Sequence, residues 1–163
     1  MGIDRVDNIL MVLGVSLRML EEHREIVTRE MIRGFNDCAL EANTLITGGQ
    51  SIMNPWPIIG GVANVVCRDD EFIKPNYGEV GDQIVLSKPL GTQPAVNLYE
   101  WFLEKNEKWI EAKKTHNEER TKKAYSLAVE SMAHLNINGA KLMKKYKTHG
   151  ATDITGFGIL GHA

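Results

Sequence analysis

Cysteine is scarce in this chain of 163 residues, which has two, Cys38 and Cys67. They form neither a CxxC pair nor another spacing typical of metal ligands, and this excludes a metal centre built on cysteines. Because free cysteine is among the most frequently buried residue types, we expect both thiols to be buried and reduced. Reduced thiols are typical of cytoplasmic proteins, so we expect a cytoplasmic location.

The chain also lacks a strong charge excess and a targeting segment. Its net charge of −2 argues against a nucleic-acid surface as the main function. The first seven residues contain two acids and one base without an apolar segment, so we expect no signal peptide. With 43% hydrophobic residues and a mean hydropathy of −0.23, the composition is that of a soluble protein with a packed core.

Charged residues are absent between Ala42 and Cys67, although 25% of the chain is charged. A run of ~20 apolar residues can span a bilayer. This run, however, contains amides, prolines and glycines whose polar groups would be unsatisfied in lipid, and a membrane helix is excluded. The pattern instead predicts a short strand at 44–46, a glycine-rich turn, and a second strand at 58–66.

The predicted turn is a candidate ligand-binding site. Gly48 and Gly49 leave backbone N–H groups open to close approach by a ligand, and Gln50 and Ser51 add side-chain donors. The alternative is a plain turn between two strands, which is the more common role of a short glycine motif.

The sequence before and after this run predicts further elements and a domain boundary. Residues 8–15 are almost continuously apolar, as in a strand covered on both faces. From about 20 to 42, apolar residues recur every three or four positions and acids gather in the first turn, which predicts an amphipathic helix. A polar connection at 68–81 marks a boundary between a first domain, 1–80, and a second, 81–163.

The second domain is predicted to open with a strand at 83–87, a turn, and a helix with Thr92 as its N-cap. Residues 115–118 have the form of a capping box and start a long helix whose apolar stripe continues to Tyr146. His134 lies beside that stripe, where we expect a structural role rather than a ligand.

Acids in two places are candidate metal ligands: a group of three at 69–71, and a single aspartate, Asp153. Asp69, Asp70 and Glu71 follow one another in the polar connection, where a solvated turn is the expected structure. Asp153 precedes a G-x-G-x-x-G pattern at 156–161, but the polar sequence before that pattern excludes a dinucleotide fingerprint. Asp153 is then either a helix cap or a hard carboxylate ligand for Mg²⁺, and the spacing alone favours the cap.

Three stretches together resemble the selenophosphate synthetases (selenide, water dikinases) in the eukaryotic form of their motifs. They are residues 7–16, residues 47–63 with Gly-Gly-Gln-Ser and Asn-Pro-Trp, and residues 151–163; residues 88–92 match as well. The resemblance covers nearly the whole chain. It implies the two-domain α/β (α+β) fold shared with aminoimidazole ribonucleotide synthetases, here truncated at both ends: an N-terminal ATP-binding and dimerisation domain, then an α/β sandwich domain.

The resemblance also implies a function and site residues. The family makes selenophosphate from selenide, ATP and water, releasing AMP and phosphate, with ATP and Mg²⁺ as cofactors. It implies a homodimer without nucleic-acid or membrane partners. Gly48, Gly49, Gln50 and Ser51 match the family's nucleotide loop, which serves the site of the second subunit. Asp153 matches one of the family's magnesium-binding aspartates.

The family's nucleophile, a cysteine or selenocysteine, and its catalytic lysine belong upstream of Met1 in this numbering. Neither Cys38 nor Cys67 lies in the nucleophile's context, so no catalytic residue is assigned within the chain. We therefore expect a central fragment of the enzyme that is inactive alone. One alternative is a non-catalytic dimerisation and nucleotide-binding module of the same family. Another is a different ATP-using enzyme of the superfamily, such as a thiamine-phosphate kinase.

Overall fold

The computed structural model describes residues 2–162, which form two compact units. The first unit comprises the chain up to Asp82 and again from Asn136 onward, and the second comprises Gln83–Leu135. Three strands and six helices in the described residues confirm the predicted α/β (α+β) class. The division into domains 1–80 and 81–163 stays a prediction, since it refers to the complete two-domain fold.

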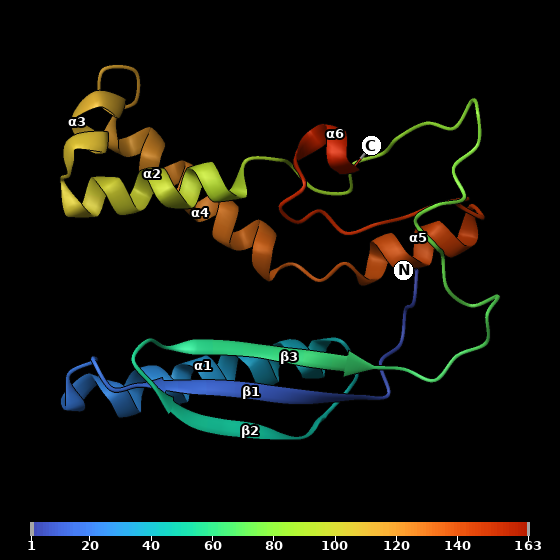
Figure 1. Ribbon diagram of the computed structural model, residues 1–163, viewed down its shortest axis with the longest axis horizontal. Helices are drawn as coiled ribbons and strands as arrows, with labels where there is room; N and C mark the ends of the chain where they lie inside the picture. The colour runs from blue at the N-terminus through green and yellow to red at the C-terminus, as the bar shows by residue number, and fades with distance from the viewer. Residues whose placement is uncertain (1, 163) are drawn as a thin grey trace. The chain divides into compact units, whose positions relative to one another are not determined.

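The sheet of the first unit is built around β1 (Asn8–Ser16), the strand that the apolar run predicts. β2 (Ile46–Asn54) pairs parallel with one side of β1, and β3 (Ile58–Asn64) pairs antiparallel with the other (Figure 1). Parallel neighbours need a crossover connection, and α1 (Glu21–Glu41) provides it. The helix predicted over 20–42 is thereby confirmed.

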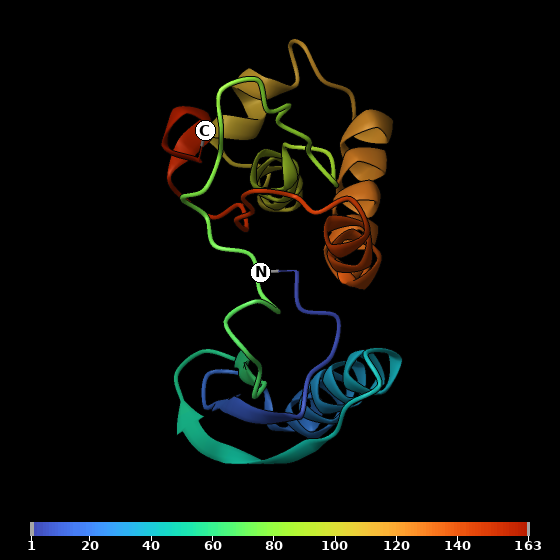
Figure 2. The ribbon, with the colours of Figure 1, turned by 90° about the vertical axis from the view of Figure 1, so that its right-hand side faces the viewer.

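Helix α1 covers one face of the sheet, as Figure 2 shows. Leu13 of β1 and Ala39 of α1 are 3% and 2% exposed. Gly61 pairs with Met11 and faces α1, because a β-carbon on Gly61 would lie 2.6 Å from Cζ of Phe35. Since alternate residues of a strand point to opposite faces, Met11 and Leu13 both point toward α1.

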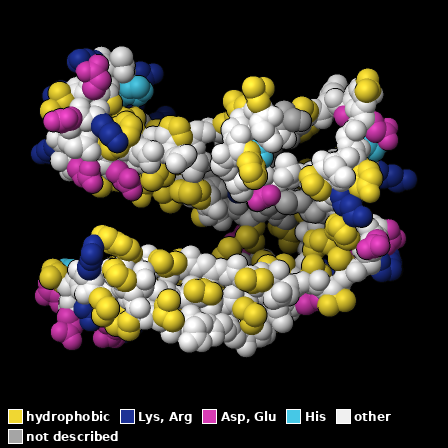
Figure 3. Space-filling model, in the orientation of Figure 1, with side chains coloured by type: hydrophobic (Ala, Val, Ile, Leu, Met, Phe, Trp, Pro, Cys, Tyr) yellow, Lys and Arg dark blue, Asp and Glu magenta, His cyan; other side chains and the backbone are white. Residues whose placement is uncertain are grey.

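The opposite face of the sheet, here called the outer face, carries a row of apolar side chains that are 41–56% exposed (Figure 3). It is formed by Leu10, Val12, Ile52, Ile58 and Val62. A sheet face turned to water ordinarily carries polar side chains. The outer face is therefore an exposed apolar surface.

The second unit is helical and is held together by aromatic side chains. Its helices are α2 (Thr92–Glu104), α3 (Glu107–Ala112) and α4 (Glu118–Ala133). The rings of Tyr99 in α2 and Tyr125 in α4 stack with their centroids 3.9 Å apart. The rings of Phe102 and Trp109 meet edge to face at 5.2 Å, and Trp109 is 7% exposed. Such aromatic pairs stabilise a small core beyond the area they bury.

The strand predicted over 83–87 is absent from the structure of the described residues, and that prediction is wrong. Ile84 and Val85 are 79% and 82% exposed, so this apolar run has no strand beside it to pair with. The predicted N-cap is wrong by one position, because Thr92 is the first residue of α2 and Gly91 is its cap.

The helix after the capping box begins two residues later than the box predicts. Asn117, not Thr115, is the N-cap of α4, and its Oδ1 accepts a hydrogen bond from the backbone N–H of Arg120 at 2.8 Å. An asparagine oxygen at this position satisfies one of the helix's free N–H groups as well as a threonine oxygen does.

The single long helix predicted to reach Tyr146 is also wrong, because α4 ends at Ala133 and α5 (Ile137–Lys145) begins after a break. His134 has an extended backbone that ends α4. The ammonium group of Lys88 donates to the carbonyl oxygens of Ser131, at 2.7 Å, and of His134. Those carbonyls are thus satisfied from outside the helix. A helix can therefore end here although the apolar repeat continues along the sequence.

Within residues 2–162, no helix is long and apolar enough to cross a membrane. The two cysteines are unpaired, with Cys38 exposed and Cys67 partly exposed. The predicted burial of both thiols is therefore wrong. A sheet of three strands covers a narrow strip of α1 around Ala39, and Cys38 lies outside that strip.

Candidate functional site

The glycine segment (residues 48–51) lies inside β2, so the prediction of a turn there is wrong. Its four residues pair in order with the four β1 residues from Leu10 to Leu13. A central apolar strand such as β1 needs hydrogen-bonding neighbours along both sides, and this requirement outweighs the turn tendency of two glycines. The connection between β2 and β3 comes later, at residues 55–57.

β2 is an edge strand of the described sheet, because β1 is its one neighbour in the strand order β2-β1-β3. An edge strand presents unpaired backbone N–H and C=O groups along its free side. The glycine segment is exposed along its whole length. Backbone donors that could approach a phosphate or a nucleobase are therefore present, on a strand edge rather than in a turn.

The two glycines of the segment differ in their surroundings. Gly49 has a φ of +143°, in a conformation that L-residues rarely adopt, and the strand register shifts nearby, between Ile9 and Leu10. A β-carbon on Gly48 would meet the side chain of Leu10 at 3.5 Å, which is an ordinary contact. The fold therefore requires glycine at position 49, whereas at position 48 it leaves room for a side chain.

The two side-chain donors of the segment point to opposite faces of the sheet. Gln50 pairs with Val12 and lies on the outer face, whereas Ser51 pairs with Leu13 and lies on the face toward α1. The Gln50 amide makes no hydrogen bond to another described residue. Of the two predicted donors, Gln50 is the one that faces a ligand or subunit approaching the outer face.

The connection after β2 is fixed to the end of β1 by contacts that the sequence analysis did not identify. The hydroxyl of Ser16, which is 4% exposed, donates to the carbonyl oxygen of Pro55 at 2.9 Å. Asn54 donates from its side-chain amide to the carbonyl oxygen of Trp56 at 2.8 Å. The guanidinium of Arg18 lies 4.3 Å from the ring centroid of Trp56. The Asn-Pro-Trp motif thus forms a rigid turn at one end of the sheet.

Asp153 lies in a segment without regular secondary structure, and α6 (Gly158–His162) begins five residues later. The helix-cap interpretation of Asp153 is therefore wrong. Its carboxylate is exposed and makes no hydrogen bond or ion pair to a described residue, while its carbonyl oxygen accepts a bond from the hydroxyl of Thr152 at 3.2 Å. The motif's last residue, Ala163, lies outside the described residues.

A free carboxylate such as that of Asp153 suits Mg²⁺, which takes one or two carboxylates together with water and phosphate oxygens. No group of three or more His, Cys, Asp or Glu side chains that could hold a metal ion is present in the described part of the chain. Asp153 thus fits one ligand of a magnesium site, and the remaining ligands would have to come from groups other than a cluster of described side chains.

Two of the three acids at 69–71, Asp70 and Glu71, form ion pairs with arginines. Asp70 pairs with Arg68 at 3.0 Å, and Glu71 pairs with Arg5 at 3.0 Å. The backbone N–H of Arg68, together with the guanidinium of Arg5, lowers the pKa of Glu71 to about 2. The Arg5–Glu71 pair joins the start of the chain to the connection that follows the sheet.

Comparisons with known proteins find relatives named selenide, water dikinase. No family model matches the chain. The chain is 53% identical over its whole length to selenide, water dikinase 2 of Homo sapiens, of which it covers 36%. It is 49% identical over 99% of its length to selenide, water dikinase of Dictyostelium discoideum, of which it covers 44%. It is 46% identical over its whole length to the probable selenide, water dikinase of Caenorhabditis elegans.

The chain spans between 36% and 44% of the length of these curated relatives. Identity at this level along the whole chain reflects common ancestry rather than a shared short motif. It confirms the resemblance that the motifs indicate. The chain is a homologue of the selenide, water dikinases and corresponds to part of their length.

Proposed function

We propose that this chain is part of an enzyme that forms selenophosphate from selenide, ATP and water, with release of AMP and orthophosphate. The observation that carries the proposal is the identity of 46–53% to proteins named selenide, water dikinase along the whole chain. We further propose a cytoplasmic location, which the two unpaired cysteines support.

In this proposal the glycine segment (Gly48, Gly49, Gln50 and Ser51) contacts the nucleotide. Phosphoryl transfer depends on positioning the phosphates and neutralising their charge more than on covalent steps by the protein. Exposed backbone N–H groups on the free edge of β2 and the unpaired amide of Gln50 are suited to that positioning. The match of this segment to the family's nucleotide loop supports the assignment.

We propose that Asp153 holds Mg²⁺, which, when bound, neutralises phosphate charge. The exposed carboxylate has no protein cation beside it among the described residues, so a metal ion can bind without displacing an ion pair. Sequence within the chain supplies no nucleophile in the family's context. The chain alone is therefore expected to bind ligands without turning them over.

We propose that the outer face of the sheet meets a second copy of the enzyme in a homodimer, with the glycine segment shared between subunits. Side chains of Leu10, Val12 and Val62 leave an exposed apolar surface beside Gln50. Burying such a surface against its own copy contributes roughly 25 cal/mol per Å². A Val12→Glu variant is expected to sediment as a monomer, and a dimeric variant would contradict this interface.

The non-catalytic dimerisation and nucleotide-binding module is the second candidate function, and the exposed outer face favours it. One experiment separates the two. AMP release is followed with selenide, ATP and Mg²⁺, for this chain and for a full-length protein that contains it. Turnover by the full-length protein alone supports the enzyme proposal. Absence of AMP from the full-length protein, with ATP still bound, would favour the module.

A further inference from the structure

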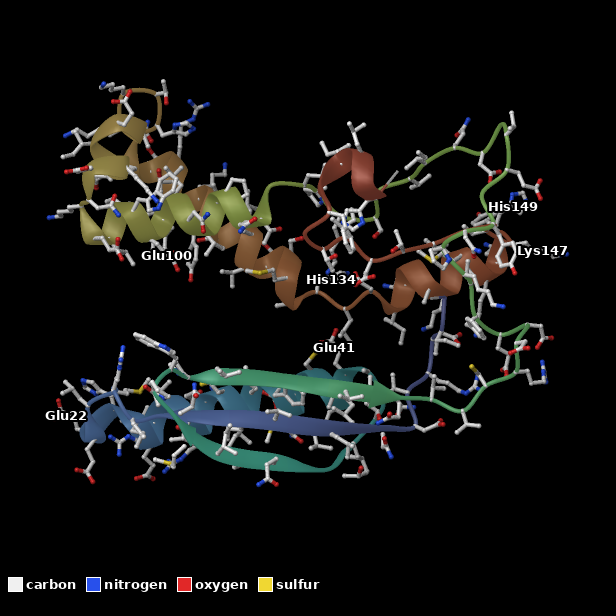
Figure 4. All side chains as sticks on the ribbon, in the orientation of Figure 1. Glu22, Glu41, Glu100, His134, Lys147 and His149 are labelled. Atoms are coloured by element: carbon white, nitrogen blue, oxygen red, sulfur yellow. The ribbon has the colours of Figure 1, made fainter. Side chains whose placement is uncertain are left out.

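We propose that His149 is a positioning residue: its ion pair with Asp82 fastens the segment that carries Asp153 to the loop at 74–82, and this attachment weakens as the pH rises. The inference rests on the proposed role of Asp153 in binding Mg²⁺. Figure 4 shows His149 and Lys147 just beyond the end of α5.

The ion pair joins two parts of the first unit that are far apart in the sequence. Nδ1 of His149 lies 2.9 Å and 3.0 Å from the two carboxylate oxygens of Asp82. The Asp82 carboxylate is itself held in place, because one of its oxygens accepts a bond from the backbone N–H of Glu79 at 2.8 Å. The imidazole therefore binds an acceptor that the loop has already oriented.

The two residues after His149 also contact this loop. The backbone N–H of Ala151 donates to the carbonyl oxygen of Lys74 at 3.4 Å. A β-carbon on Gly150 would lie 3.4 Å from the backbone nitrogen of Gly78 and 3.5 Å from the carbonyl oxygen of Pro75. Residues 149–151 thus lie directly against the loop.

Beyond Ala151 the segment makes no such attachment. In residues 152–162, the hydrogen bonds are local: Thr152 bonds the carbonyl of its neighbour Asp153, and the N–H of Thr155 bonds His162 at 3.1 Å. The contact at 149–151 is therefore the nearest one that determines where Asp153 lies, two residues further along the chain.

Several charged groups surround His149. The loop contributes Asp82 and Glu79. His149 also lines a hollow of about 510 Å³ together with charged side chains of both signs, which are Asp69, Asp70, Glu71, Lys74, Lys144 and Lys147. Asp70 and Glu71 are paired with arginines, and Lys144 is paired with Asp4. The loop acids Asp82 and Glu79 favour the protonated imidazole.

These contacts favour the charged His149–Asp82 pair. The hydrogen bond to Asp82 and then the charges of Asp82 and Glu79 raise the pKa of His149. The backbone N–H of Glu79, followed by His149, lowers the pKa of Asp82. Because the pKa of His149 is raised on folding, the pair stabilises the attachment below the ordinary histidine pKa and is lost as the pH rises through the raised value.

The test compares four variants of a full-length protein that contains this segment: His149→Gln, His149→Lys, Asp82→Asn and, as a matched control, His116→Gln, an exposed histidine of the second unit. For the His149→Gln and Asp82→Asn variants, the Mg²⁺ concentration at half-maximal AMP release is expected to rise about 2- to 5-fold at pH 6.5, the scale of an exposed ion pair. As the pH is raised to 8.5, the Mg²⁺ concentration that the wild type needs for half-maximal AMP release is expected to approach the higher value of these variants. The His149→Lys variant keeps the low value at both pH values.

A second readout does not require activity. Hydrogen exchange of the Ala151 amide, measured without metal, is expected to be faster in the His149→Gln and Asp82→Asn variants than in the wild type and in the His116→Gln control. A wild type that shows the same acceleration on going from pH 6.5 to 8.5, after correction for the intrinsic rate, supports the pH dependence.

Magnesium titrations and exchange rates of His149→Gln that superimpose on wild type would overturn the inference, while unchanged AMP release would leave the proposed function standing. Faster exchange with an unchanged magnesium titration would show an attachment without a role in metal binding, and it would overturn the positioning role. A wild-type protein that releases no AMP would contradict the proposed function instead.

Discussion

Gly49 in β2 lies against the backbone of Met11 in β1, so closely that a β-carbon on residue 49 would come within 1.8 Å of the Met11 carbonyl oxygen. Real β-carbons do not approach backbone oxygens to this distance. The sequence motif that matches a nucleotide loop thus contains one glycine that the sheet itself requires. The fold requires glycine at position 49, and the neighbouring position 50 carries the side chain proposed to contact the nucleotide.

A Gly49→Ala substitution is expected to lower the free energy of unfolding by about 1–3 kcal/mol. The alanine must adopt a φ that favours glycine, and its β-carbon must also push β2 away from β1. The measurement is the urea midpoint. Gly48→Ala is the control, since its β-carbon has room, and it is expected to shift stability by less than about 0.5 kcal/mol. Equal midpoints for both variants would contradict this account of Gly49.

A Gln50→Ala substitution in the full-length protein is expected to weaken ATP binding about 2- to 10-fold, the cost of one lost hydrogen bond. Gln93→Ala is the matched control, because Gln93 is an exposed glutamine of α2 outside the glycine segment, and its loss is expected to leave ATP affinity nearly unchanged. Titration calorimetry measures both. An unchanged affinity in the Gln50 variant would show that this amide does not contact the nucleotide.

An Asp153→Asn substitution is expected to raise the Mg²⁺ requirement of the full-length enzyme roughly tenfold or more, since it removes a charged ligand. Asp69→Asn removes a carboxylate from the polar connection and should leave the requirement unchanged. The assay is AMP release at saturating ATP over a range of Mg²⁺ concentrations. Superimposable curves for Asp153→Asn and wild type would exclude Asp153 as a ligand.

Glu71 makes the stability of the first unit depend on acidic pH. Its pKa falls from 4.5 to about 2 on folding, so its contribution is fully present above pH 4.5 and is lost as the pH falls through about 2. Thermal melting from pH 6 to pH 2 is expected to show a smaller loss of melting temperature for Glu71→Gln than for wild type. Glu119→Gln, which removes a carboxylate of α4 without an ion pair among the described residues, should follow the wild-type curve.

Elements set by local patterns could be predicted from the sequence. The apolar run of β1, the stripe of α1 and the periodicity of α2 depend on neighbouring residues, and the structure confirms all three. Motif spacing also identified the family, because the matching stretches cover nearly the whole chain. Asp153 and Gln50 were identified as candidates in the same way, and both have side chains without a bond to another described residue.

Other features depended on contacts between distant residues, which periodicity does not contain. The glycine segment became a strand because β1 needed a neighbour, and residues 83–87 did not because no strand lies beside them. Lys88 satisfies carbonyls where the predicted long helix breaks, and Asp82 meets His149 across 67 positions of sequence. The sequence by itself determined the family, the central strand and the amphipathic helices. Tertiary structure alone decided which backbone groups found partners, because a hydrogen bond depends on position in space rather than on order in the chain.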